Sequence, residues 1–284
     1  MLMDCRIGIV ILNYKNYGET IECLTNVLQQ KNVDLEIVVV DNGSKNESVD
    51  CIEKWIKPYK NISLIASEEN QGFSRGNNLG IKYLLDKGVN FIVISNSDIM
   101  FTDDNILHQI VNSYSKGIGV ITPIIKNLDG KDEMRTQYDR KMFRLRVLKH
   151  LINIQKDFKK NVVPTSDTSS YHFLEPGVQE NYNALTGCFF ALTPDYLEKF
   201  PFLYPETFLY GEEIATLLLN DKAKLLTLIA NTGTVIHKRA ASTESDLKEG
   251  TYKKRKMMAE SAKSIMKLLF MTNKQIRRKY SQND

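Results

Sequence analysis

Apolar runs alternate with helix-type segments along the first hundred residues. Continuous runs rich in Val and Ile predict strands that are buried on both faces. The predicted strands are residues 7–12, 35–40, 62–66, 91–94 and 118–125, and the predicted helices between them are residues 17–31, 47–57 and 76–87. Strands that alternate with helices predict a mostly parallel, doubly wound α/β sheet with right-handed crossovers.

The rest of the chain is less regular. Residues 126–182 contain a basic helical segment and a polar stretch, residues 164–170, that is typical of a loop. Further ordered segments are predicted at residues 185–192, 212–222 and 225–237, with a connection rich in aromatic residues at 200–210. No internal repeat is present.

The composition excludes several classes of protein. The chain has 284 residues, 42% of them hydrophobic and 25% charged, which is typical of one large globular domain or of a domain with an appendage. No apolar run approaches the ~20 residues of a membrane span, and residues 1–12 do not resemble a cleavable signal. The four cysteines form no Cys-x-x-Cys pair. We therefore expect a cytoplasmic protein with reduced thiols.

The net charge of +4 is the sum of two strongly cationic segments and a net acidic remainder. Residues 252–280 carry ten Lys and Arg against one acid, and residues 140–160 carry eight against one, so the remainder is net acidic. Each segment also has an apolar stripe at helical spacing. The stripes are Val147, Leu151, Ile154 and Phe158 in the first segment, and Met258, Ala262, Ile265 and Leu269 in the second.

Residues 241–284 are expected to form a basic amphipathic helical extension. Cations around an apolar stripe suit an anionic membrane surface, which would make the protein peripheral on the inner face of the cell membrane. The alternative is a helix that packs on the core or on a second subunit and leaves its basic face in solvent. Binding of nucleic acid is not expected, because the stripes lack interleaved aromatic residues.

Three common sites are missing from the sequence. There is no Gly-x-Gly-x-x-Gly after the first strand, no Gly-x4-Gly-Lys-Ser/Thr and no Gly-x-Ser-x-Gly. The sequence therefore argues against a dinucleotide site, a P-loop and an α/β-hydrolase nucleophile.

Polar residues follow the predicted strands instead. Ligands of doubly wound sheets bind beyond the carboxyl ends of the strands, and those ends carry residues 13–14, 41–44 and 95–98. Asp41 could accept a hydrogen bond from the imide N–H of uracil or thymine, or it could belong to a turn formed by Asp-Asn-Gly. Asp98 suits Mg²⁺ or Mn²⁺, although an N-cap role is the alternative.

Two more positions could take part in chemistry. Glu212 and Glu213 begin a predicted helix, where acids favour the helix dipole. One of them could instead act as a general base, with its pKa raised by its neighbour. His237 ends the last predicted strand, and by itself a lone histidine is seldom a metal ligand.

Seven stretches of the chain share their order and spacing with a known family. They are residues 9–14, 36–44, 70–80, 93–98, 186–190, 208–213 and 235–237. Over residues 5–240 the chain thereby resembles the family 2 glycosyltransferases of the GT-A fold, especially their rhamnosyltransferase-like branch. The resemblance implies a GT-A domain at residues 1–240, followed by the extension at 241–284.

The resemblance also implies roles for individual residues. Asn13 and Tyr14 would line the nucleoside pocket, Asp41 would read the base, and Gly72, Asn78 and Asn96 would lie near the donor. Asp98 and His237 would bind the metal ion, and Glu213 would be the catalytic base with Glu212 beside it. The chain departs from the family pattern at Asn96 and Glu213, where Asp is usual, and at Ala215, where an acid is usual.

The function that follows is the inverting transfer of a sugar from a UDP- or dTDP-linked donor. The acceptor would be a hydroxyl group of a glycan or polyprenyl-linked molecule in surface polysaccharide biosynthesis. Mn²⁺ or Mg²⁺ would stabilise the leaving diphosphate, and a Glu would deprotonate the acceptor. The alternative is a non-catalytic nucleotide-sugar-binding or scaffold protein on a decayed transferase fold. A nucleotidyltransferase would need a Gly- and Lys-rich loop after the first strand, and residues 13–18 do not resemble one.

Overall fold

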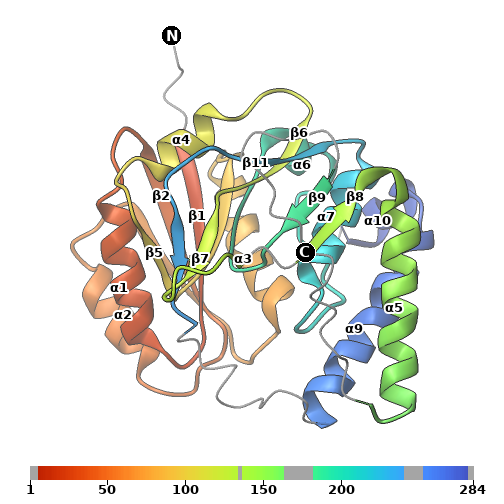
Figure 1. Ribbon diagram of the computed structural model, residues 1–284. Helices are drawn as coiled ribbons and strands as arrows, with labels where there is room; N and C mark the ends of the chain where they lie inside the picture. Colours follow the sequence, from red (N-terminus) through yellow and green to blue (C-terminus); the bar gives the residue numbers. More distant parts are fainter. Residues whose placement is uncertain (1–5, 134–135, 163–181, 240–251, 281–284) are drawn as a thin grey trace.

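A seven-stranded sheet forms the centre of the molecule (Figure 1). The computed structural model describes residues 6–133, 136–162, 182–239 and 252–280. Across the sheet the strands are β11 (Leu226–Ile229), β6 (Ile118–Thr122), β10 (Phe189–Leu192), β4 (Ile92–Asn96), β1 (Arg6–Asn13), β2 (Asp34–Asp41) and β3 (Ile62–Ala66). All neighbouring pairs are parallel except those of β10, which is antiparallel to β4 and β6. The predicted α/β fold is confirmed.

Helices cover both faces of this sheet, because the side chains of its strands are apolar on both sides. Along β1, Ile9 and Ile11 face one hydrophobic cluster and Val10 faces the other. The first cluster is covered by α1 (Tyr17–Leu28), α2 (Ser48–Ile56) and α4 (Ile106–Asn112). The second is covered by α3 (Phe73–Asp86), α5 (Phe143–Lys159), α6 (Pro194–Lys199), α7 (Glu212–Lys222), α9 (Tyr252–Phe270) and α10 (Asn273–Tyr280).

Several predicted segments divide between the central sheet and two small sheets. The small sheets are β5 (Ile99–Phe101), β12 (Val235–His237) and β7 (Ile125–Asn127), and β8 (Thr136–Asp139) with β9 (Tyr182–Leu185). The strand predicted at 118–125 is therefore wrong as one strand. It breaks at Thr122-Pro123, because proline cannot donate a hydrogen bond to a strand ladder. A 3₁₀ turn, η1 (Arg140–Met142), precedes α5.

The C-terminal helices pack on the core. Ala262, Ile265 and Leu269 of the predicted stripe are buried in the same cluster as Val10 of β1. On α5, Val147 and Leu151 are buried in that cluster too. Five of the eight stripe residues are therefore buried in the core. The predicted boundary at residue 240 and the predicted loop at 164–170 lie outside the described residues.

No helix in the described parts of the chain combines the length and the apolar character that crossing a membrane requires.

Candidate active site

Asn13 and Asp41 lie side by side at the carboxyl ends of β1 and β2, where the parallel register pairs them. Asn13 Nδ2 donates to Asp41 Oδ2 at 2.6 Å, and Thr20 Oγ1 donates to Asn13 Oδ1 at 2.7 Å. The other Asp41 oxygen accepts from the Ser44 main-chain N–H at 3.0 Å. Both Asn13 and Asp41 are buried. Their polar groups therefore fix the turn after β2, as the turn interpretation of Asp41 predicts.

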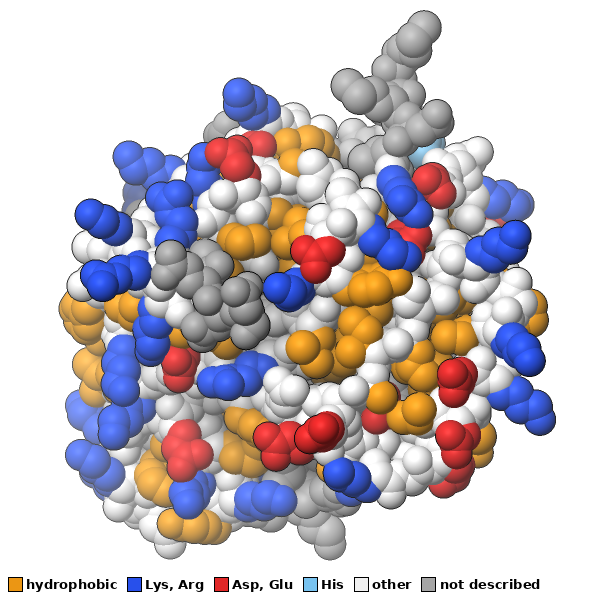
Figure 2. Space-filling model, turned by 180° about the vertical axis from the view of Figure 1, so that it is seen from behind, with side chains coloured by type: hydrophobic (Ala, Val, Ile, Leu, Met, Phe, Trp, Pro, Cys, Tyr) orange, Lys and Arg blue, Asp and Glu red, His pale blue; other side chains and the backbone are white. Residues whose placement is uncertain are grey.

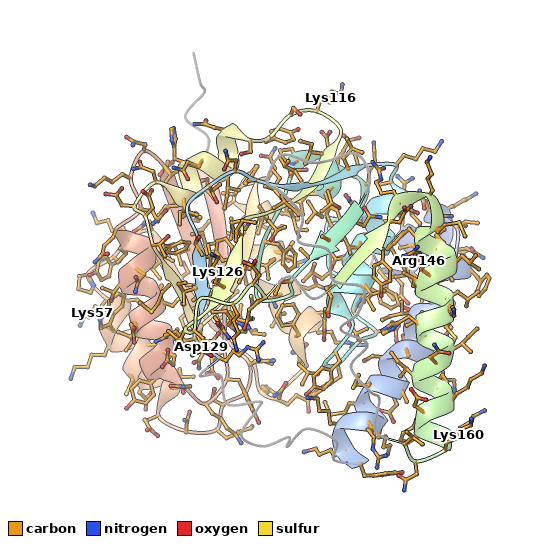
Figure 3. All side chains as sticks on the ribbon, in the orientation of Figure 1. Lys57, Lys116, Lys126, Asp129, Arg146 and Lys160 are labelled. Carbon is orange, nitrogen blue, oxygen red and sulfur yellow. The ribbon has the colours of Figure 1, made fainter. Side chains whose placement is uncertain are left out.

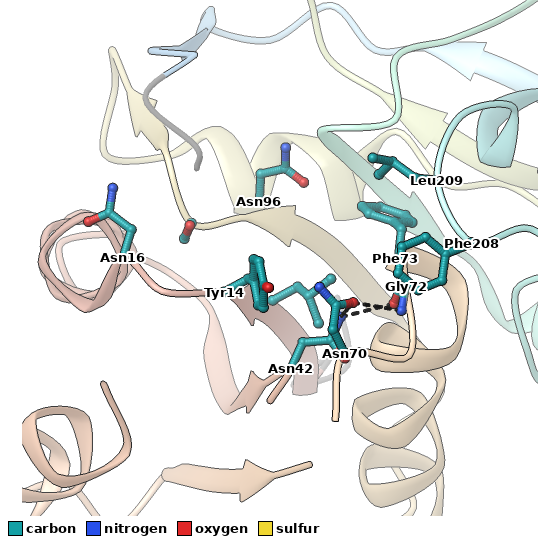
Figure 4. Close-up of a pocket in the computed structure, with 11 residues that line it drawn as sticks. Tyr14, Asn16, Asn42, Asn70, Gly72, Phe73, Asn96, Phe208 and Leu209 are labelled. Carbon is teal, nitrogen blue, oxygen red and sulfur yellow. Dashed lines mark hydrogen bonds between the residues drawn. The ribbon is translucent and has the colours of Figure 1, made fainter. Parts of the chain in front are cut away.

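A pocket of about 130 Å³ opens beside this turn (Figure 4). It lies at the carboxyl edge of β1 and β4, where ligands of doubly wound sheets are expected. Tyr14 and Asn96, both predicted site residues, line it. The other lining residues are Leu12, Asn16, Asn42, Asn70, Gly72, Phe73, Ser97, Phe208 and Leu209. The pocket offers neutral amide groups on one wall and aromatic side chains on another.

Asn42 fixes the amide wall. Its Nδ2 donates to Asn70 Oδ1 and to the Gly72 carbonyl, each at 3.1 Å (Figure 4). Its Oδ1 accepts from the Gln71 main-chain N–H at 3.0 Å. Asn42 and Asn70 were not among the predicted site residues, although both lie in stretches that resemble the family. Their polar character next to two strand ends is the signal that could have identified them.

Gly72 and Asn78 hold the connection between α6 and α7 against α3. Gly72 has φ +81°, and a Cβ there would collide with the Phe208 carbonyl oxygen. Asn78 Nδ2 donates to the Leu203 carbonyl at 2.8 Å, while its Oδ1 accepts from the Leu203 N–H at 2.7 Å. Gly72 lines the pocket, but Asn78 does not. Asn78 thus acts on the pocket only by holding the chain that leads to Phe208.

Asp98, two residues after Asn96, lies next to His237. Asp98 follows β4, and His237 ends β12, which pairs with β5 so that His237 lies opposite Ile99. His237 Nε2 is 3.4 Å from Asp98 Oδ1, and Asp98 is fully buried. The sequence separates these two side chains by more than a hundred residues, and the strand pairing brings them together.

Glu133 is a third member of this group, and the sequence analysis did not select it. It is buried, and its Oε2 is 2.7 Å from His237 Nδ1, which leaves His237 Nε2 directed at Asp98. Its other oxygen pairs with Arg239. Cys188 is also near, since ligand atoms of Glu133, Cys188 and His237 lie within 4.8 Å of one another. No spacing in the sequence links residue 133 to residue 237.

The charges of this group shift its pKa values. Burial alone would lower the pKa of His237, but hydrogen bonds with Asp98, Cys188 and Glu133 outweigh it and raise the pKa to about 12. Burial would raise the pKa of Glu133, yet His237 and Arg239 hold it below its usual value. With the proton of His237 Nε2 displaced, Asp98 and His237 would offer one carboxylate and one imidazole nitrogen. That pair suits Mn²⁺ well and Mg²⁺ less well, because Mg²⁺ prefers oxygen ligands.

Glu212 and Glu213 occupy the first turn of α7, after Gly211 in a left-handed conformation. Glu212 is buried, and burial together with the neighbouring Glu213 raises its pKa to about 8. Glu213 is half-buried, and a methyl group at Gly187 would lie 3.7 Å from its Oε2. Residue 188, next in the chain, accepts a hydrogen bond from the Asn96 N–H at 2.8 Å. The Glu213 carboxylate therefore lies beside the turn that adjoins Asn96.

Comparison with known proteins places the chain among sugar transferases. A family model described as glycosyl transferase family 2 matches residues 8–173. A low-salt glycan biosynthesis hexosyltransferase of Haloferax volcanii is 31% identical over 125 residues, which cover 44% of this chain and 38% of that protein. A teichoic acid poly(glycerol phosphate) polymerase of Staphylococcus epidermidis is 33% identical over 75 residues, covering 26% and 10%. The matched segments thus span well under half of these relatives.

Two solved structures share the fold. A mannosyltransferase from Pyrobaculum calidifontis, in complex with GDP-Man and Mn²⁺, has a TM-score of 0.56 at 13% identity and covers 94% of this chain and 70% of its own. GalNAc-T7 with UDP, GalNAc and Mn²⁺ has a TM-score of 0.58 at 14% identity, covering 85% and 45%. These likenesses confirm the predicted GT-A architecture.

Proposed function

The chain belongs to glycosyl transferase family 2, and on this premise we propose that it transfers a sugar from a nucleotide-diphosphate-sugar to a hydroxyl group of a glycan or polyprenyl-linked acceptor. The observation that carries the proposal is the convergence of groups from separate elements at one edge of the sheet. Asn96 and Asp98 come from the end of β4, His237 from β12 and Glu213 from α7. The product would enter a surface polysaccharide, and the cytoplasmic location and the rhamnosyltransferase-like branch stay predictions.

The donor nucleotide would occupy the pocket of about 130 Å³. Tyr14 gives it an aromatic wall, and Asn42 holds Asn70 and Gly72 in place on its amide wall. Asp41 would act on the base through the turn that it holds in place, since it is buried and accepts hydrogen bonds from Asn13 and Ser44. We favour UDP or dTDP. The related structures were solved with GDP-Man or UDP, so guanine nucleotides belong in the test.

Asp98 and His237 would hold a divalent ion, Mn²⁺ or Mg²⁺. When bound, the ion supplies Lewis-acid stabilisation to the charge on the departing diphosphate. Glu133 keeps the His237 ring turned so that its Nε2 faces Asp98. Asn96 contributes a neutral amide where many family members have a carboxylate, so this chain places fewer negative charges around the diphosphate.

Glu213 would be the general base. Its carboxylate would take the proton of the acceptor hydroxyl while that oxygen attacks the anomeric carbon and the nucleoside diphosphate leaves. A single displacement of this kind inverts the anomeric configuration. Glu212 suits this role less well, because it is buried and its raised pKa keeps it protonated near neutral pH. A neutral Glu212 also avoids a second negative charge beside the base.

Ligand-dependent thermal stability tests the donor site. UDP, dTDP, GDP and CMP would be added with and without Mn²⁺ to the wild type and to Asp98→Ala. A ligand at ~100 times its Kd adds about 2.7 kcal/mol of stability. We expect one pyrimidine diphosphate to stabilise the wild type in the presence of Mn²⁺ and to lose that Mn²⁺ dependence in Asp98→Ala. A protein that responds to no nucleotide would contradict the proposal.

Glu213→Gln separates an enzyme from a non-catalytic scaffold. We expect turnover to fall by roughly 10²–10⁴-fold, the usual contribution of a general base, while nucleotide affinity stays within a factor of about two. The readout is release of nucleoside diphosphate from a panel of sugar donors and acceptors. A wild type that binds nucleotide but turns over none of the donors would favour the scaffold.

A further inference from the structure

The outer face of α5 combines exposed apolar side chains with cations. Met142, just before the helix, and Leu145 and Ile152 within it are 46%, 59% and 37% exposed. They recur at a spacing of three and seven residues, which places them on one side of a helix. Exposed large apolar side chains gathered on one helix face mark an interaction surface.

Cations frame these apolar side chains. Arg146, Lys149, Lys156 and Lys160 are all exposed on α5 or at its C-terminal end. Figure 3 labels Arg146 in the upper half of α5 and Lys160 at its lower, C-terminal end. Within the described parts of the chain, no ion pair involves these four cations. Arg144 differs, because its Nε lies 2.6 Å from Asp221 Oδ2. The charge of the outer face is therefore available to a partner.

The opposite face of α5 fixes the helix to the protein. Phe143, Val147 and Leu151 are buried in the core, and α9 packs alongside. Seen from behind, Lys and Arg side chains gather along the edge of the molecule where α5 and α9 lie (Figure 2). The outer face is thus a firmly held surface rather than a loose helix that could turn its apolar residues inward.

We propose that the outer face of α5 docks on an anionic lipid bilayer. A helix that lies in the plane of an interface inserts its apolar residues among the headgroups, while its Lys and Arg contact anionic lipids. Met142, Leu145 and Ile152 supply the inserted groups. A second copy of the chain suits this surface poorly, because a two-fold contact would bring like charges together.

This docking would place the membrane near the start of α7, which carries the proposed base. The C-terminal end of α5 meets the first residue of α9, where the Phe158 and Tyr252 rings are 5.8 Å apart. Two residues further, Lys254 Nζ lies 5.3 Å from the Tyr210 ring, close to the start of α7. The inference deepens the proposed function by assigning it a membrane-bound acceptor, and only that assignment rests on the proposed function.

Vesicle sedimentation of the full chain tests the docking. We expect the wild type to pellet with vesicles of mixed phosphatidylcholine and phosphatidylglycerol at low salt, and not with pure phosphatidylcholine. Each cation removed from the outer face of α5 should weaken binding about fivefold. The double variant R146Q/K160Q should therefore bind roughly 25-fold more weakly. The matched variant K57Q/K116Q removes two exposed lysines from other edges of the molecule (Figure 3) and should bind as the wild type does.

The apolar residues distinguish a bilayer from a soluble polyanion. We expect L145S/I152S to lose about tenfold or more in vesicle binding, because two apolar side chains that would insert into the bilayer are removed. Its binding to heparin should stay unchanged. The inference is overturned if the wild type does not pellet, if the two charge variants bind equally, or if L145S/I152S binds vesicles as the wild type does. Nucleotide affinity measured without vesicles reports separately on the proposed function.

Discussion

Glu212 is a buried carboxyl group beside a second carboxylate, and its titration should appear in the stability of the protein. Its pKa rises from 4.5 to about 8 in the fold. The folded state then holds a proton that the unfolded state releases. The stability that Glu212 contributes is complete below pH 4.5 and is lost as the pH rises through about 8.

Glu212→Gln stays neutral at every pH, so we expect it to lose less stability than the wild type as the pH rises from about 5 to about 9. A pKa that rises from 4.5 to about 8 corresponds to a difference of a few kcal/mol across this range. Urea unfolding across this range measures it. Glu198→Gln, at a 71% exposed side chain, is the control and should follow the wild type. Parallel curves for the wild type and Glu212→Gln would contradict the prediction.

Glu133 should control how tightly the proposed metal site binds its ion. Groups that orient a metal-binding histidine typically contribute 10–100-fold to affinity, so we expect Glu133→Gln to weaken Mn²⁺ binding by about that factor. Electron paramagnetic resonance of free Mn²⁺ measures the affinity without sugar transfer. Asp132→Asn removes the neighbouring exposed acid and should leave the affinity unchanged. Equal affinities in both variants would mean that other contacts orient the ring.

For individual residues, the sequence predicts the site residues that lie near strand ends. It does not predict those that reach the site only through contacts between distant parts of the chain. Asp98 and His237 were predicted, the second only through resemblance to a family. Glu133 follows a turn between β7 and β8, and nothing in its neighbourhood marks it as a partner of His237. Its contact exists because β12 pairs with β7, a pairing that joins residues more than a hundred positions apart.

The start of helix α3 supports one wall of the pocket. Gly72 has φ +81°, and an added Cβ would collide with the Phe208 carbonyl oxygen. Gly72→Ala should therefore shift the Phe208 segment, lower stability by several kcal/mol and weaken nucleotide binding. Thermal unfolding and nucleotide titration measure the two effects.

Gly88→Ala is the matched control for Gly72→Ala. Gly88 has a similar φ of +78°, but a Cβ there meets nothing within 4 Å. It should cost only the backbone strain, about 1–2 kcal/mol, and leave nucleotide affinity unchanged. If Gly72→Ala costs no more than Gly88→Ala, the close approach of Gly72 to Phe208 has no energetic weight.

The elements of the first hundred residues were predictable because each parallel strand is a continuous apolar run. The later segments were predicted less well. The run at 118–125 serves two sheets, β6 and β7, since Pro123 ends the first ladder. The antiparallel direction of β10 also escaped prediction, because Phe189–Leu192 is as apolar as a parallel strand and its pattern carries no sign of direction.

In the whole molecule, the C-terminal helices connect the core to the segment before α7. Ser261 Oγ of α9 donates to the Leu209 carbonyl at 3.0 Å, and a Cβ at Gly211 would lie 2.7 Å from Ile265 Cδ1. Leu209 lines the pocket, and Gly211 precedes Glu212. The basic C-terminal segment, which differs from the rest of the chain in its charge, therefore packs against residues of the candidate site. This is why we expect it to unfold together with the sheet.

Leu268→Ala tests that expectation. Leu268 of α9 is fully buried, and such a substitution typically costs 2–5 kcal/mol. Trp55, the single tryptophan of the chain, lies on α2 across the sheet from α9, so its fluorescence reports on a distant part of the fold. If the sheet and α9 unfold as one unit, the midpoint seen by Trp55 should fall as much as the midpoint seen by circular dichroism. Lys267→Ala, at the exposed neighbouring position, should change neither. A Trp55 midpoint that stays at the wild-type value would instead mean that α9 is an appendage whose stability is separate from that of the sheet.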